Sequence, residues 1–306
     1  MSHFGDRLIE EGRRKRTALV VGLDPDLRFI PEAIRQGADP ETGEGAEEAI
    51  FAFNRVVIDA VAEHVVAVKP QLAYYEIYGA SGITALERTI RYARSKGLLV
   101  LNDAKRGDIG PTSAAYARAF LGDGPIAGDM VTVNPFLGSD GYMPFIETAE
   151  AAGKGVFVLL KTSNPSSGEL QDLKLDGGGM LYMKLAEELE RLAARSIGLH
   201  GYSCVGAVVG GTYPEEARAI RTALKSAIFL VPGYGAQGGS ADSLRPFFDA
   251  RGEGAIVSSS RAILYAYRNV GEHWSSLSEA EISRAIGEEA SRAKDAINAV
   301  RGLRSQ

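Results

Sequence analysis

The sequence is poor in cysteine, and Cys204 is the single thiol among 306 residues. One cysteine excludes an intrachain disulfide and is typical of a protein that works in a reducing compartment, so we expect a cytoplasmic location. Cys204 lies in an apolar run, which favours a buried small side chain over a nucleophile.

Long apolar runs are also missing. No stretch reaches the roughly 20 consecutive apolar residues that span a membrane. Residues 1–16 lack the apolar core of a secretion signal. We therefore expect neither membrane insertion nor export. The basic residues 13–16 are more typical of a solvated helix end than of a nucleic-acid site.

Metal ligands and net positive charge are scarce. The four histidines, His3, His64, His200 and His273, show no metal-ligand spacing, and we expect no metal site. The formal net charge is −5 and the pI is about 5.6, which argues against a nucleic-acid or anionic-membrane partner. An anionic substrate would therefore need a local basic pocket.

What the sequence does contain is eight short apolar runs that alternate with longer amphipathic segments. Nearly continuous apolar runs are typical of parallel strands buried on both faces. The runs are residues 17–24, 65–69, 98–103, 129–134, 155–161, 204–210, 227–233 and 254–259. The segments between them predict helices over residues 46–63, 82–96, 113–120, 142–152, 180–197, 214–225 and 241–250. This order predicts an α/β fold, a (β/α)8 TIM barrel built as a single domain over residues 1–306.

Some segments fall outside this repeat. Residues 6–16 and 278–300 predict extra N- and C-terminal helices, and Thr212 is expected to cap the helix that begins at residue 214. Residues 36–45 and 166–179 are rich in glycine and acidic side chains, and we expect solvated loops there. The second loop follows the fifth strand at the expected active-site end, so a mobile lid is an alternative.

Charged residues gather where the predicted strands end, which is where active sites lie in such barrels. Asp24, Lys69 and Asp103 end three consecutive apolar runs. Any one of them could belong to a structural ion pair, but that interpretation is weak for three such residues at the ends of consecutive strands. Lys105 lies two residues beyond Asp103 and should share its strand face, and Asp108 follows on a loop. The pattern predicts an alternating Lys–Asp–Lys–Asp array.

Such an array has a definite chemical character. Flanking carboxylates keep each lysine protonated, and flanking ammonium groups keep each aspartate ionised, so the four groups titrate together. Protonated lysine is a poor nucleophile and cannot bind a metal. The array is suited to placing fixed charge beside a reacting anion.

A glycine-rich segment follows the seventh predicted strand. Gly233, Gly235 and Gly238 fit the G-x-G-x-x-G pattern of dinucleotide-binding folds, but they lie in the seventh unit of a long series and not at its start. In a barrel, the loops after strands seven and eight bind phosphate through backbone N–H groups. Arg261, after the eighth strand, would add a fork of donors.

The segment DAKRGDIGPT, residues 103–112, resembles the D-x-K-x-x-D-I motif of the orotidine 5′-phosphate decarboxylase family. Further matches lie in order along the whole chain: GLD near the start, VKP at strand two, KTSNP at strand five, VPGYGAQGG at strand seven and SSSR at strand eight. The segments KRGDIG and KTSNP together resemble the longer bacterial branch of that family.

The resemblance implies decarboxylation of orotidine 5′-phosphate to uridine 5′-phosphate and CO2, the last step of pyrimidine nucleotide (UMP) biosynthesis, without a cofactor. It implies that Asp103 lies near the departing carboxylate, that Lys105 stabilises the carbanion and protonates C6, and that Lys69 and Asp108 complete the catalytic set. The substrate-binding residues that we expect are Asp24, Ile109, Thr112, Ser163, Asn164, Pro232, Gln237, Gly238, Ser260 and Arg261, with Asn164 inferred from adjacency to Ser163.

The resemblance also implies a homodimer with shared sites, in which Asp108, Ile109 and Thr112 reach the site of the partner. Two alternatives stay open. One is a magnesium-dependent sugar-phosphate decarboxylase or aldolase-type barrel, such as a hexulose phosphate synthase, which shares the D-x-K-x-x-D core. The other is a barrel that binds a nucleotide without catalysis, although a binder has no need of both lysines.

Overall fold

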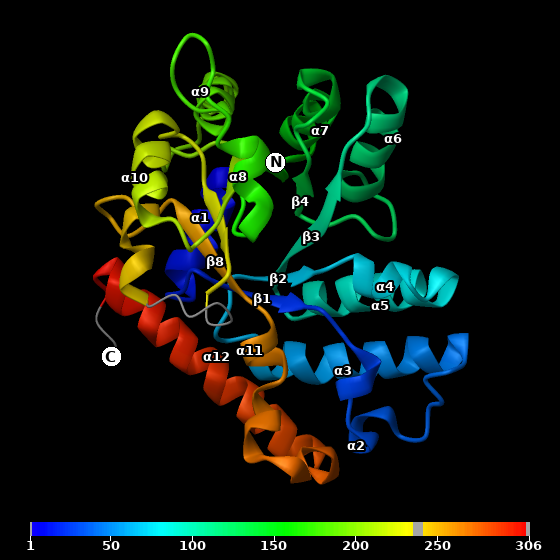
Figure 1. The fold of residues 1–306 in the computed structure, drawn as a ribbon. Helices are drawn as coiled ribbons and strands as arrows, with labels where there is room; N and C mark the ends of the chain where they lie inside the picture. Colours follow the sequence, from blue (N-terminus) through cyan, green and yellow to red (C-terminus); the bar gives the residue numbers. More distant parts are fainter. Residues whose placement is uncertain (1, 235–240, 304–306) are drawn as a thin grey trace.

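Eight parallel strands close into a barrel in the computed structural model, which describes residues 2–234 and 241–303 (Figure 1). The strands follow chain order around the barrel, and β8 pairs with β1 to close it. They are β1 (Leu19–Leu23), β2 (Ala67–Pro70), β3 (Leu99–Arg106), β4 (Met130–Val133), β5 (Gly155–Lys161), β6 (Val205–Val209), β7 (Phe229–Pro232) and β8 (Ala255–Ser259). The predicted (β/α)8 barrel is confirmed.

Helices surround this barrel, and the predicted ones other than that over residues 241–250 are present with shifted ends. The longer helices are α1 (Phe4–Arg14), α3 (Gly43–Val61), α5 (Gly79–Ser95), α6 (Gly110–Leu121), α7 (Ser139–Ala152), α9 (Leu181–Ala193), α10 (Pro214–Ala223) and α12 (Glu279–Arg301). Short helical segments that were not predicted are η1 (Leu27–Phe29), α2 (Glu32–Arg35), α4 (Ala73–Glu76), η2 (Pro165–Ser167), α8 (Gly168–Gln171), α11 (Arg261–Leu264), η4 (Ala266–Val270) and η5 (Glu272–Ser276).

Four local expectations were wrong. The segment 241–250 is not an α-helix but a 3₁₀ helix, η3 (Ala241–Phe247), and Pro246 within it has no N–H for an α-helical bond. Thr212 does not cap α10, because Tyr213 holds the cap position without a side-chain bond. The expected loop 166–179 contains α8, and α3 begins inside the expected loop 36–45 with Thr42 as its cap.

Helix α1 covers the N-terminal end of the barrel. Phe4 is buried against Gly155, at the start of β5. Arg7 pairs with Asp129, just before β4, at 2.9 Å. Arg13 pairs with Glu253, just before β8, at 2.6 Å. These contacts close one end of the barrel and leave the carboxyl ends of the strands free for a binding site.

Helix α12 ties the end of the chain to the same region. It begins with a capping box between Ser278 and Glu281. Near its end, Asn298 donates to the carbonyl of Arg16 at 2.8 Å, and Arg301 donates to the carbonyl of Gly252 at 2.7 Å. Across residues 2–234 and 241–303, no helix is both long and apolar enough to cross a membrane.

Gly155 offers a test of this end closure. A methyl group added at Gly155 would overlap the buried ring of Phe4, so Gly155→Ala should lower the free energy of unfolding by about 1–3 kcal/mol. Gly177→Ala is the matched control, because a methyl group there meets nothing within 4 Å. Urea unfolding compares the two variants, and an equal effect of both would contradict tight packing of α1 on the barrel.

Candidate active site

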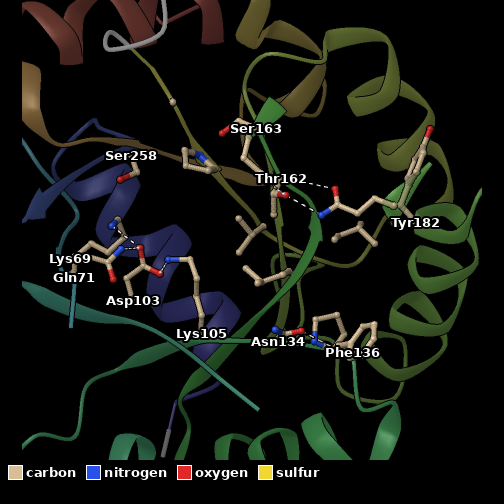
Figure 2. Close-up of a pocket in the computed structure, with 18 of the residues that line it drawn as sticks. Lys69, Gln71, Asp103, Lys105, Asn134, Phe136, Thr162, Ser163, Tyr182 and Ser258 are labelled. Atoms are coloured by element: carbon tan, nitrogen blue, oxygen red, sulfur yellow. Dashed lines mark hydrogen bonds and ion pairs between the residues drawn. The ribbon is translucent and has the colours of Figure 1, made fainter. Parts of the chain in front are cut away.

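A cavity of about 810 Å³ opens at the carboxyl ends of the strands. Its polar side chains come from the ends of the strands and from α8. They are Asp24, Lys69, Gln71, Asp103, Lys105, Asn134, Thr162, Ser163, Asn164, Gln171, Ser258, Ser260 and Arg261. Figure 2 shows the charged side chains on one side of the cavity and Thr162 and Tyr182 on the opposite side.

The carboxylate of Asp103 is the centre of the charged side. Its Oδ2 accepts from Lys69 Nζ at 2.8 Å and from Gln71 Nε2 at 3.0 Å. Its Oδ1 accepts from Lys105 Nζ at 2.5 Å and from Thr132 Oγ1 at 3.0 Å. Each oxygen therefore receives one ammonium group and one neutral donor, and the carboxylate is fixed in both position and rotation.

The charges in this cluster stabilise one another. Burial alone would raise the pKa of Asp103, but the ammonium groups of Lys69 and Lys105 hold it well below its usual range. Burial alone would lower the pKa of Lys69, but the carboxylates of Asp103 and Asp24 raise it. Asp103 is therefore an anion and Lys69 a cation over the whole neutral range of pH.

The two lysines differ in their access to the cavity. The side chain of Lys69 is 6% exposed, whereas that of Lys105 is 45% exposed. Lys69 is thus buried behind the carboxylate of Asp103, and the ammonium group of Lys105 faces the open space. A ligand can reach Lys105 directly.

Regular strand alternation does not explain how Lys105 reaches Asp103. The pairing of β3 with β4 shifts between Asn102 and Arg106, and Lys105 has a φ of 46°, in the left-handed region. The N–H of Lys105 donates to Thr132 Oγ1 at 2.9 Å. The expected same-face geometry is therefore replaced by a bulge, and a strained backbone conformation holds the ammonium group.

A second group of polar residues lines the cavity beside β1 and β8. Asp24 follows β1, and its buried Oδ1 has no hydrogen-bond partner within the described ranges. Burial raises the pKa of Asp24, and Lys69 acts in the opposite direction. Pro232, Ser260 and Arg261 line the cavity too. An unpaired buried acceptor at a cavity wall is suited to a ligand that donates a hydrogen bond.

The wall formed by β5 and α8 carries amide and hydroxyl groups. Ser163 and Asn164 line the cavity, as expected. Gln171 accepts from the N–H of Thr162 at 2.9 Å and donates to its Oγ1 at 2.8 Å. Behind this wall the buried Lys161 pairs with Asp172 at 2.6 Å. The segment that was expected to be a solvated loop therefore contributes part of the cavity wall.

The predicted four-membered array is not formed within one chain. Ile109 and Thr112 are exposed and Asp108 is half-buried, and none of the three lines the cavity. Asp108 accepts only from the N–H of Ile109, at 2.8 Å, among the bonds of the described residues. Gln237 and Gly238 lie outside the described residues. Among the residues described, no group of three or more His, Cys, Asp or Glu side chains could hold a metal ion.

Sequence reasoning missed two donors to Asp103. Gln71 lies two residues beyond Lys69, so the spacing argument used for Asp103 and Lys105 would have placed it beside the cluster. Thr132 is a polar residue inside the buried run of β4, where a hydroxyl needs a partner. Both signals were present in the sequence, but neither residue is charged.

Known proteins share this fold and this sequence pattern. The family model described as "Orotidine 5'-phosphate decarboxylase / HUMPS family" matches residues 17–275. A relative from Caldicellulosiruptor bescii, named orotidine 5′-phosphate decarboxylase, is 43% identical over 280 residues, 88% of this chain and 92% of that protein. A relative of the same name from Rhodopirellula baltica is 43% identical over 273 residues, 88% of this chain and 90% of that protein. The structure of OMP decarboxylase from Leishmania donovani has a TM-score of 0.75 and 31% identity, and covers 99% of this chain and 100% of that one.

The cluster predicts an unusual pH dependence for Asp103→Asn. Without the carboxylate, burial lowers the pKa of Lys69 below its ordinary 10.5. The unfolded chain then binds more protons, so the free energy of unfolding should rise as the pH increases towards 10.5. In the wild type the raised pKa of Lys69 gives the opposite sign: its contribution is full below 10.5 and is lost at higher pH.

Urea unfolding from about pH 6 to 10 measures this difference. Asp108→Asn is the control, because Asp108 lies outside the cluster and its side chain bonds to the N–H of Ile109 and to neither lysine. Parallel pH profiles for Asp103→Asn and the wild type would show that Asp103 does not keep Lys69 charged.

Proposed function

The chain belongs to the orotidine 5′-phosphate decarboxylase / HUMPS family and is an enzyme of the carboxy-lyase kind with a role in pyrimidine biosynthesis, and from this premise we propose its substrate, its mechanism and its site residues. The proposed reaction converts orotidine 5′-phosphate into uridine 5′-phosphate and CO2 without a cofactor. Lys105 is the proposed proton donor to C6 of the pyrimidine ring. The observation that carries the proposal is the Lys69–Asp103–Lys105 cluster at the open end of the barrel.

The fixed charge of Asp103 supports its proposed role. Its carboxylate already accepts four hydrogen bonds, so it is suited to act as a permanent anion and not as a base. Placed beside the substrate carboxylate, it would disfavour the bound anion and favour the loss of neutral CO2. Interactions that become more favourable as the reaction proceeds are those that accelerate it.

The exposed ammonium group of Lys105 supports the next step. When the C6–CO2 bond breaks, its electron pair stays on C6 as a carbanion. A preorganised ammonium group stabilises this charge and then transfers a proton to C6. Lys69, buried behind Asp103, keeps the carboxylate ionised while Lys105 reacts.

The remaining residues are proposed to bind the rest of the substrate. Arg261, with Ser260, is the proposed phosphate contact, because a guanidinium group binds phosphate oxygens through paired donors. Asp24 is the proposed acceptor for a ribose hydroxyl, and its unpaired Oδ1 supports this. Ser163 and Asn164, on the β5 wall, would contact the pyrimidine ring. Pro232 completes this substrate-binding set, and the proposal also includes Gln237 and Gly238 at the phosphate.

A homodimer with shared sites is the proposed assembly. Neighbouring loops at the open end of the barrel expose large apolar side chains: Ile77 is 68% exposed, Ile109 is 54% exposed and Phe136 is 72% exposed. Exposed apolar groups gathered at one end favour an interface. Pairing at this end would bring Asp108, Ile109 and Thr112 of one chain to the cavity of the other.

We propose that residues 1–306 act as one domain in the cytoplasm, with no nucleic-acid or membrane partner.

A second candidate function remains within the same family description, which also covers HUMPS proteins. That candidate is a magnesium-dependent sugar-phosphate enzyme. A barrel that binds a nucleotide without catalysis is the third. Activity with and without a metal chelator separates the three.

Lys105→Ala should fold normally and lose turnover by several orders of magnitude, because both carbanion stabilisation and the proton donor are removed. The measurement is the loss of absorbance of orotidine 5′-phosphate in the presence of a chelator. Lys225→Met, which removes an exposed lysine outside the cavity lining, is the matched control and should keep full activity.

Each result has a distinct meaning. Turnover by the wild type in chelator supports the cofactor-free decarboxylase, and turnover that needs magnesium supports the sugar-phosphate alternative. Uridine 5′-phosphate production by Lys105→Ala at a near-normal rate would rule out Lys105 as the proton donor.

Subunit mixing tests the shared site. Lys105→Ala and Asp108→Ala homodimers should each be inactive, because each lacks one residue of every site. After subunit exchange at equal amounts, half of the dimers are mixed and have one intact site, so about a quarter of the wild-type activity should return. No recovery despite proven exchange would place Asp108 outside the partner's site.

A further inference from the structure

We propose that Tyr265 is a positioning residue that joins the segment carrying Arg261 to the loop carrying Asp24, so that the phosphate and the ribose of the substrate meet a single rigid unit. This inference rests on the proposed function, in which Arg261 contacts phosphate and Asp24 contacts ribose. Tyr265 itself does not line the cavity.

The hydroxyl group of Tyr265 makes two bonds to the loop after β1. It donates to the backbone carbonyl of Asp24 at 2.8 Å and accepts from the N–H of Asp26 at 2.9 Å. At the other end of the residue, the N–H of Tyr265 donates to the carbonyl of Arg261 at 3.1 Å. One residue therefore links the backbone of both proposed ligand-binding residues.

Aromatic packing holds the hydroxyl group in place. The ring of Tyr265 stacks on Phe53 with the centroids 6.0 Å apart and meets Phe29 edge-on at 5.4 Å. Burial raises the pKa of Tyr265, so the hydroxyl keeps the proton that it donates. The ring is held by packing against its aromatic neighbours. The hydroxyl group is therefore available to fix the loop.

A second contact joins the same two segments. Ser260 is the residue before Arg261, and it lines the cavity together with Asp24. Ser260 also lies so close to Gly22, in β1, that any side chain at position 22 would overlap its hydroxyl. The start of the Arg261 segment thus packs on β1 through Ser260, and the loop that follows β1 is held through Tyr265.

This arrangement has a consequence for the use of binding energy. Phosphate lies far from the reacting carbon, so its binding accelerates the reaction only if it fixes the position of the ring. If Asp24 and Arg261 keep a constant separation, phosphate bound at Arg261 fixes the position of the ribose at Asp24, and so of the ring attached to it. Removing the Tyr265 hydroxyl frees the loop 24–26 and leaves Asp24 free to shift relative to Arg261.

The test is a pair of matched tyrosine variants. Tyr265→Phe keeps the ring and should lower kcat/KM roughly tenfold, the effect of losing one or two buried hydrogen bonds that act on the substrate. Tyr267→Phe is the control, because Tyr267 lies in the same aromatic cluster and donates to the carbonyl of Phe29 and not to Asp24. It should lose similar thermal stability and keep wild-type kcat/KM.

A double-mutant cycle with Asp24→Ala separates positioning from a general structural effect. If Tyr265 acts through Asp24, Tyr265→Phe should cause no further loss in the Asp24→Ala background. The same cycle is measured on the Kd for uridine 5′-phosphate, which does not require turnover. An equal loss in both backgrounds, or equal kcat/KM for the two tyrosine variants, would overturn the inference.

The outcomes also separate this inference from the proposed function. If the wild type decarboxylates its substrate but the effects of Tyr265→Phe and Asp24→Ala are additive, the proposed function stands and the positioning role of Tyr265 is ruled out. If the wild type shows no turnover but the two substitutions have coupled effects on uridine 5′-phosphate binding, the proposed function is ruled out and the role of Tyr265 stands. A wild type that neither turns over nor binds this nucleotide overturns both.

Discussion

The carboxylate of Asp103 is the point on which the open end of the barrel depends. Donors from β2, β3 and β4, with Gln71 just beyond β2, saturate both of its oxygens. A buried carboxylate is tolerated only when it is paired and hydrogen-bonded in this way. The same bonds keep Lys69 charged and hold Lys105 at the cavity. One anion therefore organises the ends of three neighbouring strands.

The barrel divides stability and chemistry between its two ends. The N-terminal end is closed by α1 through apolar packing and ion pairs such as Arg7–Asp129. The carboxyl end holds the unpaired acceptor of Asp24, the backbone strain at Lys105 and the exposed apolar groups. Features that cost stability are collected at one end, and the other end compensates for them.

Much of this could be predicted from the sequence, because strands buried on both faces leave a clear apolar signal and a charge at the end of such a strand needs a partner or a ligand. The strand ends, Lys69, Asp103 and Asp24 were found for this reason. The neutral donors Gln71 and Thr132 were missed, since uncharged side chains do not stand out. The left-handed backbone at Lys105 could not be foreseen from a residue type that seldom adopts it. Asp108 was expected in the same array, but within one chain it does not line the cavity. The 3₁₀ form of η3 reflects Pro246, which was visible but was outweighed by the helical pattern.

The positive φ of Lys105 has an evolutionary consequence. Glycine adopts this backbone conformation without strain, and every other common residue pays for it. At position 105, the residue that best suits the backbone has no ammonium group, and the residue that carries the ammonium group is a poor fit to the backbone. In the proposed mechanism, selection for a more stable fold and selection for turnover therefore oppose each other at this one position. The presence of lysine at this position indicates that the requirement for the ammonium group outweighed the requirement for an unstrained backbone.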